Sequence, residues 1–524
     1  QGPAKDLGFS TAHPIHVTST GRKPIGFFVA MNAMGTPAAA QRHKTQPMEA
    51  FLMRRPRPDF VLRAALAYAC TQVGSGLLAL GPAVGQAGWV GVPVIVLCGL
   101  CGAYTSYTLG WTIFRLQATA TEGSQTIKEE VEESTSGSET DGSSTSSSSQ
   151  EESPITKERT FQSYEDVSEQ ALGIFGRLIS LLLQGLMLVG VCTIFLVLIG
   201  VNAAQLEEMY NVDWLSKRDV ILVAAGLELF PCILVGTVKE TFILTAIGAL
   251  CSAICAVVVV VAAFTTSSNK LQSCLEMGET MQWPLFTDFK GLSLCWNTVV
   301  FSFGGINVLP TLLVDFHSRG VLARALVSFT WRSYLFIIFF YVIVAVCGFA
   351  VGGNAMASRK VDSNVLIGLQ GCQDNHSGSP DWSLLVAYAS ITLHVVLAFP
   401  VPFHACAETL ESVLGIRQKL LGASWGPGLL LRLPRLVLLA ACTALAYSLP
   451  FFGALLNVVA AIAGQATVFI LPILLSWAIQ RQQKYKVRGY DWFLGTLCLI
   501  VGILGAVTGL YYGLNELVSA FKST

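Results

Sequence analysis

Long apolar runs, separated by short polar segments, dominate the chain between residues 60 and 513. A helix needs about 20 apolar residues to cross a hydrocarbon layer about 30 Å thick, and eleven runs come near or exceed that length. The predicted spans are 60–82, 88–114, 174–202, 219–238, 241–265, 293–315, 328–352, 382–406, 433–451, 453–479 and 490–513. The pattern therefore predicts an all-α membrane protein with about eleven transmembrane helices.

The boundary between the ninth and tenth spans depends on the dipeptide Leu449-Pro450. A single helix over 433–479 would be far too long for any bilayer, so a break is required. Proline lacks a backbone N–H and ends or kinks a helix, which makes this dipeptide the predicted break.

Composition agrees with a membrane location. The 524 residues are 53% hydrophobic and only 13% charged, with a mean hydropathy of +0.59, whereas soluble domains carry about 25% charged residues. The 33 basic residues equal the 33 acidic ones, so no nucleic-acid partner is expected. The cysteines fall mostly in apolar runs, where packing is the expected role, including that of the Cys98-x-x-Cys101 pair.

Polar stretches divide the rest of the chain. Residues 1–58 are predicted to be a disordered cytoplasmic tail without a cleavable signal peptide. The first two helices occupy 59–116. The acidic, serine-rich residues 117–160 are predicted to form a disordered cytoplasmic loop, which is interpreted as a passive linker with a phosphorylated regulatory segment as the alternative. An amphipathic surface segment opens 161–515, which holds the third to eleventh helices, and 516–524 form a short extracytoplasmic C-terminus.

Lysine and arginine gather in alternate loops. If the N-terminus lies in the cytoplasm, the outside loops hold only seven of the 33 basic residues, namely Lys217, Arg218, Lys270, Lys290, Arg359, Lys360 and Lys522. Cytoplasmic loops of membrane proteins carry the excess of basic residues, and this distribution therefore favours a cytoplasmic N-terminus.

Two features of the outside loops suggest covalent modification. The sequon Asn375-His376-Ser377 lies between the seventh and eighth spans and predicts glycosylation of Asn375. Cys274 and Cys372 fall in the two largest outside loops, where an oxidising exterior would allow a disulfide. The sequence does not give the distance between them, so this pairing is a hypothesis.

Glycines interrupt the first and the sixth span. Gly74 and Gly76 lie in the first, and Gly304 and Gly305 lie in the sixth, shortly before Pro310. Each interrupted span opens a set of five, spans 1–5 and 6–10, which leaves the eleventh as an addition. Interrupted helices at matching positions in two halves are typical of a transporter binding site at the bilayer midplane.

The physical reason lies in the main chain. Glycine lets the backbone unwind and a ligand approach, and the freed N–H and C=O groups need partners inside the membrane. A zwitterion supplies both, because its carboxylate suits the N–H groups at the start of a half-helix and its ammonium suits the freed carbonyls. The alternative is that these glycines only allow close helix packing.

Several motifs are similar to those of a known family. They are Thr71-Gln72-Val73-Gly74-Ser75-Gly76, the turn Gln86-x-Gly88-Trp89, Tyr104-Thr105-Ser106, the segment 303–310, and 450–453 followed by Gly464 and Leu471-Pro472. Over about residues 60–515 the chain resembles the amino acid/auxin permease family. The resemblance implies the LeuT-like fold, a 5+5 inverted repeat plus one extra helix. It also implies amino acid transport, usually driven by a proton gradient.

The resemblance also implies the substrate site. The substrate carboxylate would lie at the backbone after the first break, and the ammonium at the carbonyls around the sixth. The implied substrate-binding residues are Thr71, Val73, Gly74, Ser75, Gly76, Phe301, Ser302, Phe303, Gly304 and Asn307.

The coupling ion is predicted to be a proton. The family's sodium-coupled branch uses an Asn in helix 1 and a Thr in helix 8, and the matching positions here are Cys70 and Ala398, which offer no comparable oxygen ligand. A proton needs a titrating group, and Glu228 and His394 are the main intramembrane candidates. Either could instead be a hydrogen-bonded structural group. The further ionisable residues near spans six and eight are Asp315, His404 and Glu408.

The resulting prediction is a secondary active amino acid transporter that works by alternating access. We expect no enzymatic activity, no cofactor beyond the coupling ion, and a monomer in the lipid bilayer of a plasma or vacuolar/lysosomal-type membrane. The alternatives are an amino-acid-sensing receptor on the same scaffold, a sodium-coupled transporter, and a carrier of polyamine or auxin-like compounds.

Overall fold

The computed structural model describes the chain between residues 61 and 523, with gaps. Residues outside the description are 1–60, 63–64, 67, 70–71, 75, 137–162, 213–214, 235–241, 266–280, 311, 314–322, 358–362, 371–381, 417–431, 486 and 524. For 120–136 and a few other helix residues only the backbone is described. Apart from turns and short extended connections, the described residues are helical, which confirms the predicted all-α class.

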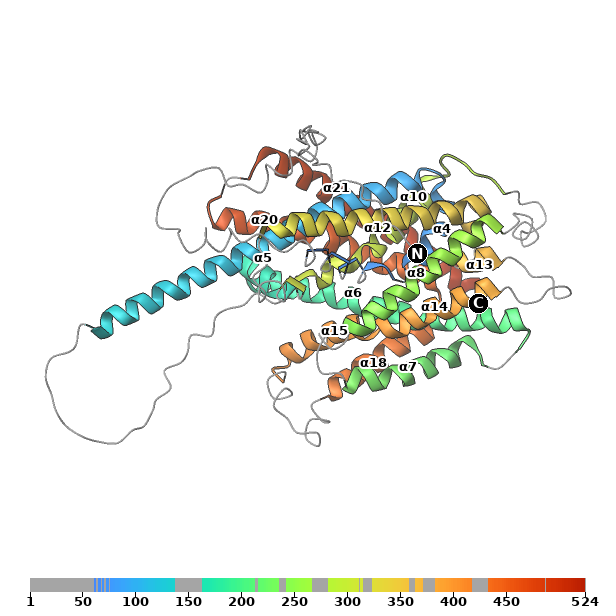
Figure 1. The fold of residues 1–524 in the computed structure, drawn as a ribbon, viewed down its shortest axis with the longest axis horizontal. Coiled ribbons are helices and arrows are strands. Elements are labelled where there is room, and N and C mark those ends of the chain that lie inside the picture. Colours follow the sequence, from blue (N-terminus) through green and yellow to red (C-terminus); the bar gives the residue numbers. More distant parts are fainter. Residues whose placement is uncertain are drawn as a thin grey trace, which may run out of the picture. The chain divides into compact units, whose positions relative to one another are not determined.

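Figure 1 shows the helices in their order along the chain. They are α4 (Gly76–Ala87), α5 (Gly91–Ser136), α6 (Tyr164–Tyr210), α7 (Lys217–Leu234), α8 (Phe242–Thr265), α10 (Phe289–Ser302), the 3-10 helix η2 (Gly304–Val308), α12 (Ala323–Gly352), the 3-10 helix η3 (Gly353–Ala357), α13 (Val365–Gln370), α14 (Trp382–Ala398), α15 (Pro400–Val413), α18 (Leu433–Ser448), α19 (Phe452–Val459), the π-helical turns η5 (Ala460–Gly464) and η6 (Ala466–Ile470), α20 (Leu471–Gln482) and α21 (Gly489–Ser523).

Within the described residues, seven helices are long and apolar enough to cross a membrane. They are Gly91–Thr119, Tyr164–Tyr210, Ile247–Thr265, Ala325–Ala357, Trp382–Val413, Phe452–Gln482 and Gly489–Lys522. Each coincides with a predicted span. The other four predicted spans coincide with shorter or interrupted helices, namely α4, α7, α10 with η2, and α18. The total of eleven crossings therefore stays a prediction.

Two helices continue into segments that were predicted to be a loop or a tail. Helix α5 runs on to Ser136, through the first part of the segment predicted to be a disordered loop. Half of the residues 117–136 are Glu, Gln, Ala or Lys, which are good helix formers. Helix α21 reaches Ser523 and includes almost all of the predicted C-terminal tail. The predicted break before the tenth span is confirmed, because α18 ends at Ser448 and α19 begins at Phe452.

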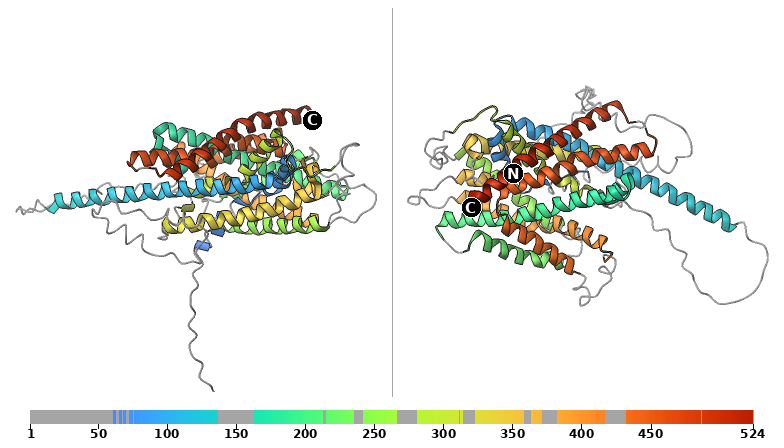
Figure 2. Two further views of the ribbon diagram at one scale, coloured as in Figure 1. Left: turned by 90° about the horizontal axis from the view of Figure 1, so that it is seen from above. Right: turned by 180° about the vertical axis from the view of Figure 1, so that it is seen from behind.

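The packing places the interrupted helices side by side. Helix α4 contacts α10 and α12, and α12 also lies along α5. The left view of Figure 2 shows α12 alongside α5. Helix α14 packs against α8 and α6. Helix α4, which follows the break of the first span, is thereby flanked by α10 and α12.

Candidate functional site

The first span is interrupted at its predicted glycines. Helical structure ends at Gln72, Val73 and Gly74 form a bend, and α4 begins at Gly76. The Val73 N–H donates to the Ala69 carbonyl at 3.0 Å, and the Gly74 carbonyl accepts the Leu77 N–H at 3.0 Å. The first span therefore consists of two separate helical pieces joined by this bend.

The sixth span is interrupted at the matching place. Helix α10 begins at the N-cap Asp288, whose Oδ1 accepts the Gly291 N–H at 2.6 Å, and ends at Ser302. The chain then continues through the 3-10 helix η2. Within η2 the Asn307 Nδ2 donates to the Gly304 carbonyl at 2.9 Å, so the Asn307 side chain satisfies part of the unwound backbone.

The two breaks touch each other. A Cβ atom placed on Gly76 would lie 2.8 Å from the Cα of Ser302, and one on Gly305 would lie 3.0 Å from the Cδ of Gln72. A side chain at Gly76 would require the Ser302 backbone to move, and one at Gly305 would require the Gln72 side chain to move, so glycine suits both positions. The glycines therefore allow close packing of the two spans and also lie at the breaks, so both interpretations of them apply.

A cavity of about 100 Å³ lies between the breaks. Its lining comes from both interrupted spans, from α6 and from the α14–α15 region, and consists of Gln72, Val73, Gly74, Gly76, Met187, Leu188, Val191, Phe195, Phe301, Ser302, Gly304, Gly305, Asn307, Val308, His394, Ala398, Val401 and Pro402. The arrangement brings together elements that are far apart in the sequence and encloses a site large enough for a small solute.

Seven of the ten residues predicted for substrate binding line this cavity, namely Val73, Gly74, Gly76, Phe301, Ser302, Gly304 and Asn307. Phe303 does not appear in its lining. Its buried ring packs instead against Tyr334 and Tyr341, with ring centroids 5.8 Å and 5.2 Å apart. Thr71 and Ser75 lie outside the described residues.

Helix α6 contributes a wall of the cavity that was not predicted from the sequence. Met187, Leu188, Val191 and Phe195 face the cavity from this helix. A Cβ on Gly304 would lie 2.6 Å from the Cε of Met187, so the Met187 side chain closes directly over the second break. No local signal distinguishes these residues from the rest of an apolar membrane helix.

His394 presents a free ring nitrogen to the cavity. Its Nδ1 lies 2.7 Å from the Gly248 carbonyl oxygen on α8, and a carbonyl only accepts, so Nδ1 is the donor. In the neutral ring Nε2 is then an acceptor. Nε2 has no hydrogen-bond partner among the described residues and would lie 3.3 Å from a Cβ on Gly74. The Oδ1 of Asn307 also has no hydrogen-bond partner among the described residues.

Glu228, the other coupling candidate, lies elsewhere. It is buried on α7, does not line the cavity, and neither carboxyl oxygen has a hydrogen-bond partner among the described residues. The structure therefore does not bring Glu228 and His394 into one cavity. Asp315, Asn375, Cys274 and Cys372 lie outside the described residues. Glycosylation and the disulfide accordingly stay predictions.

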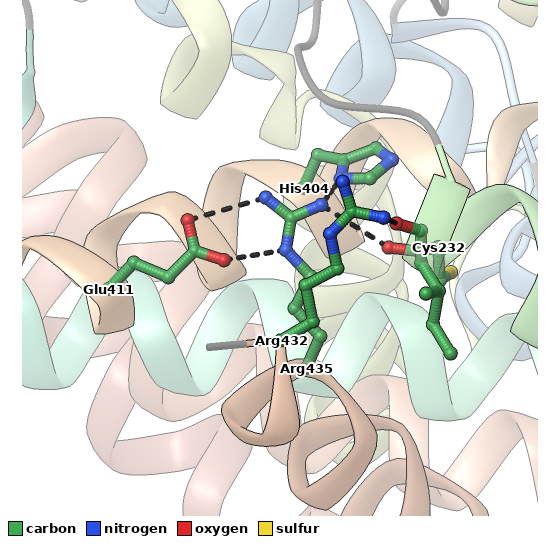
Figure 3. A network of polar contacts seen from close by, with 6 residues as sticks. Cys232, His404, Glu411, Arg432 and Arg435 are labelled. Carbon is green, nitrogen blue, oxygen red and sulfur yellow. Dashed lines mark hydrogen bonds and ion pairs between the residues drawn. The ribbon is translucent and has the colours of Figure 1, made fainter. Parts of the chain in front are cut away.

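A second buried polar cluster joins α7, α15 and α18 (Figure 3). Arg435 and Glu411 form a two-point ion pair, Nε to Oε1 at 2.5 Å and Nη2 to Oε2 at 3.3 Å. The Arg435 Nη1 also donates to the Cys232 carbonyl at 3.3 Å and lies 3.5 Å from the Nδ1 of His404. Arg432 donates to the Ile233 carbonyl at 2.8 Å. Two guanidinium groups thus satisfy the last carbonyls of α7, where a cation is favoured by the helix dipole.

Comparison with known proteins identifies related sequences. The chain is similar to the lysine histidine transporter-like 3 protein of Arabidopsis thaliana, with 22% identity over 378 residues that cover 70% of this chain and 77% of the relative. It is also similar to the amino acid transporter AVT1J of the same plant, with 22% identity over 69% of this chain and 78% of the relative. The profile of the family described as transmembrane amino acid transporter protein matches residues 57–128 and 145–514. The chain, a multi-pass integral membrane protein, therefore belongs to this transmembrane amino acid transporter family.

Proposed function

We propose that the chain is a secondary active amino acid transporter that holds its substrate between the two helix breaks and works by alternating access. The observation that supports this most directly is the cavity between the two interrupted helices. The proposal includes the LeuT-like architecture, in which spans 1–5 and 6–10 form an inverted repeat. It also includes a cytoplasmic N-terminus, a monomeric carrier, and a plasma or vacuolar/lysosomal-type membrane.

The proposed substrate pose follows from the partial charges at the breaks. The carboxylate would lie at the start of α4, next to Gly74, Ser75 and Gly76, because the first N–H groups of a helix have no intrahelical partner. The ammonium would lie near the Oδ1 of Asn307 and the carbonyls at the end of α10. An acceptor that is buried without a partner costs free energy, and a bound ammonium would recover part of it. Thr71 is the remaining proposed contact.

The lining favours a neutral substrate with an apolar side chain. Apart from His394, the described lining residues carry no ionisable side chain, and most are aliphatic or aromatic. A lysine substrate would bury its terminal ammonium without a carboxylate partner, which is costly in this environment. One relative has lysine and histidine in its name, so a cationic substrate is the second candidate.

We infer that the coupling ion is a proton and that His394 carries it. His394 is the ionisable side chain in the cavity lining, and its Nε2 is available there. A proton on Nε2 would place a positive charge beside the first break, so occupancy by the proton and by the substrate would be energetically linked. Glu228 is the second candidate, because its buried carboxyl also lacks a partner among the described residues.

The proposal is tested with purified protein in liposomes. A panel of labelled amino acids is offered under an imposed proton or sodium gradient. Accumulation of neutral amino acids driven by the proton gradient is expected. A strict sodium requirement would reverse the ion assignment, and saturable binding without flux would indicate a sensor.

A further inference from the structure

We propose that Tyr341 is a positioning residue that ties the two helix breaks to each other and to α12. Its hydroxyl lies 2.8 Å from the Gln72 carbonyl oxygen and 2.8 Å from the Ser302 carbonyl oxygen. Gln72 is the last helical residue before the first break, and Ser302 is the last residue of α10. One side chain from a third helix thus contacts the main chain at both breaks.

Both carbonyls belong to the last turn of a helical piece, where carbonyls have no intrahelical donor. In a continuous α-helix the Gln72 oxygen would accept the N–H of Gly76, and the Ser302 oxygen would accept that of Ile306. The bend at 73–74 and the 3-10 turn at 304–308 interrupt the regular α-helical bonding pattern at both places. Inside a membrane such groups must find another donor. Tyr341, which is fully buried, supplies it.

The hydroxyl carries one hydrogen for two acceptors. Both carbonyls can only accept, so the hydrogen is shared between them or passes from one to the other. If one break moves during transport, the hydroxyl can complete its bond with the other. The states of the two breaks are therefore coupled, because a change at one alters how far the hydrogen is available to the other.

The aromatic ring of Tyr341 is itself held in place. Phe303, which directly follows α10, meets it edge-on at a centroid distance of 5.2 Å and stacks on Tyr334 at 5.8 Å. Both tyrosines are fully buried on α12. The ring therefore has little room to turn away from the breaks, and the position of its hydroxyl is set by packing.

Tyr334 provides a matched control. Like Tyr341, it is a fully buried tyrosine of α12 that packs on Phe303. Its hydroxyl, however, lies 2.8 Å from the Oγ of Ser106 on α5 and not at the main chain of a break. Tyr334→Phe therefore removes a buried hydroxyl from the same helix without removing the proposed tie.

The first measurement does not depend on transport. Amide hydrogen exchange is recorded for purified wild type, Tyr341→Phe and Tyr334→Phe. We expect faster exchange in Tyr341→Phe at both 72–77 and 301–308, and wild-type rates at these segments in Tyr334→Phe. Unchanged rates in Tyr341→Phe, a change at one break alone, or an equal change in both variants would overturn the inference.

The second measurement rests on the proposed function. In liposome uptake, Tyr341→Phe is expected to raise KM about tenfold, since it leaves a buried carbonyl unpaired, while Tyr334→Phe stays close to wild type. A tenfold loss in Vmax at constant KM in both variants would indicate a general structural role and overturn the inference. If wild-type protein moves no amino acid, the proposed function fails, and the exchange measurement still decides whether the tie exists.

Discussion

Gly76 and Ser302 are in direct contact across the two helix breaks, with 2.8 Å between the Cα of Ser302 and the place that a Cβ on Gly76 would take. The neighbouring atom belongs to the main chain and not to a flexible side chain, so it cannot turn away. The two unwound segments therefore share one packed surface. Any added atom on that surface must push the breaks apart.

The first prediction concerns this contact. Gly76→Ala should lower amino acid uptake about tenfold or more, because an extra methyl group in a packed site costs roughly 1–3 kcal/mol. Liposome uptake at equal protein amounts measures it. Gly226→Ala on α7 is the control, since nothing lies within 4 Å of a Cβ at Gly226. Wild-type uptake by Gly76→Ala would show that the breaks do not need this close approach.

The bulkier change Gly74→Leu tests the site itself. A leucine side chain would enter the cavity beside the Nε2 of His394, which lies 3.3 Å from a Cβ at this position. We expect uptake to be abolished while the protein still folds and remains in the membrane, as shown by a normal gel-filtration profile. Normal uptake by this variant would show that the substrate does not bind at the first break.

A third prediction separates the two buried histidines. His394→Gln should abolish accumulation driven by a proton gradient while leaving exchange of labelled for unlabelled amino acid, because glutamine cannot titrate. His404→Gln, a buried histidine outside the cavity lining, should keep gradient-driven uptake. Retained proton coupling in His394→Gln would show that His394 does not carry the coupling proton. Glu228 would then be the candidate, and Glu228→Gln would test it.

The ion pair in Figure 3 predicts a stability effect. Arg435→Met leaves the Glu411 carboxylate buried without its partner and should destabilise the protein by about 3–5 kcal/mol. The double variant Arg435→Met/Glu411→Leu should regain much of the loss. Arg177→Met is the control, because Arg177 and Glu169 form a pair with side-chain exposures of 38% and 32%, and such pairs contribute about 0–1 kcal/mol. Thermal unfolding in detergent measures all three, and equal shifts for the two single variants would refute the prediction.

A fifth prediction addresses selectivity. Met187→Ala widens the cavity on the α6 side and should raise the uptake of bulky aromatic relative to aliphatic amino acids by roughly tenfold, the scale expected for removing side-chain volume from an apolar pocket. Met209→Ala, on the same helix but outside the lining, should leave the ratio unchanged. An unchanged ratio in Met187→Ala would mean that substrate side chains lie elsewhere.

The sequence alone determined the features that the lipid environment imposes locally. Each membrane helix must be apolar over about 20 residues and must satisfy its own backbone hydrogen bonds. The pattern of residues therefore indicated the spans, the break before Phe452, and the glycines at which the first and sixth spans are interrupted. These properties depend on neighbours in sequence, so no tertiary contact was needed to predict them.

Only the tertiary structure decided which side chains meet. In a membrane protein, residues that face lipid, a neighbouring helix or a cavity are equally apolar, so hydrophobic periodicity does not separate them. For this reason Met187 in the cavity wall, Phe303 turned towards α12, and the Arg435–Glu411 pair were not predicted. The same holds for Tyr341, since a tyrosine in an apolar helix gives no sign of which carbonyls its hydroxyl will reach. Those contacts arise when helices distant in sequence pack together and the buried polar atoms take the partners that the packing offers.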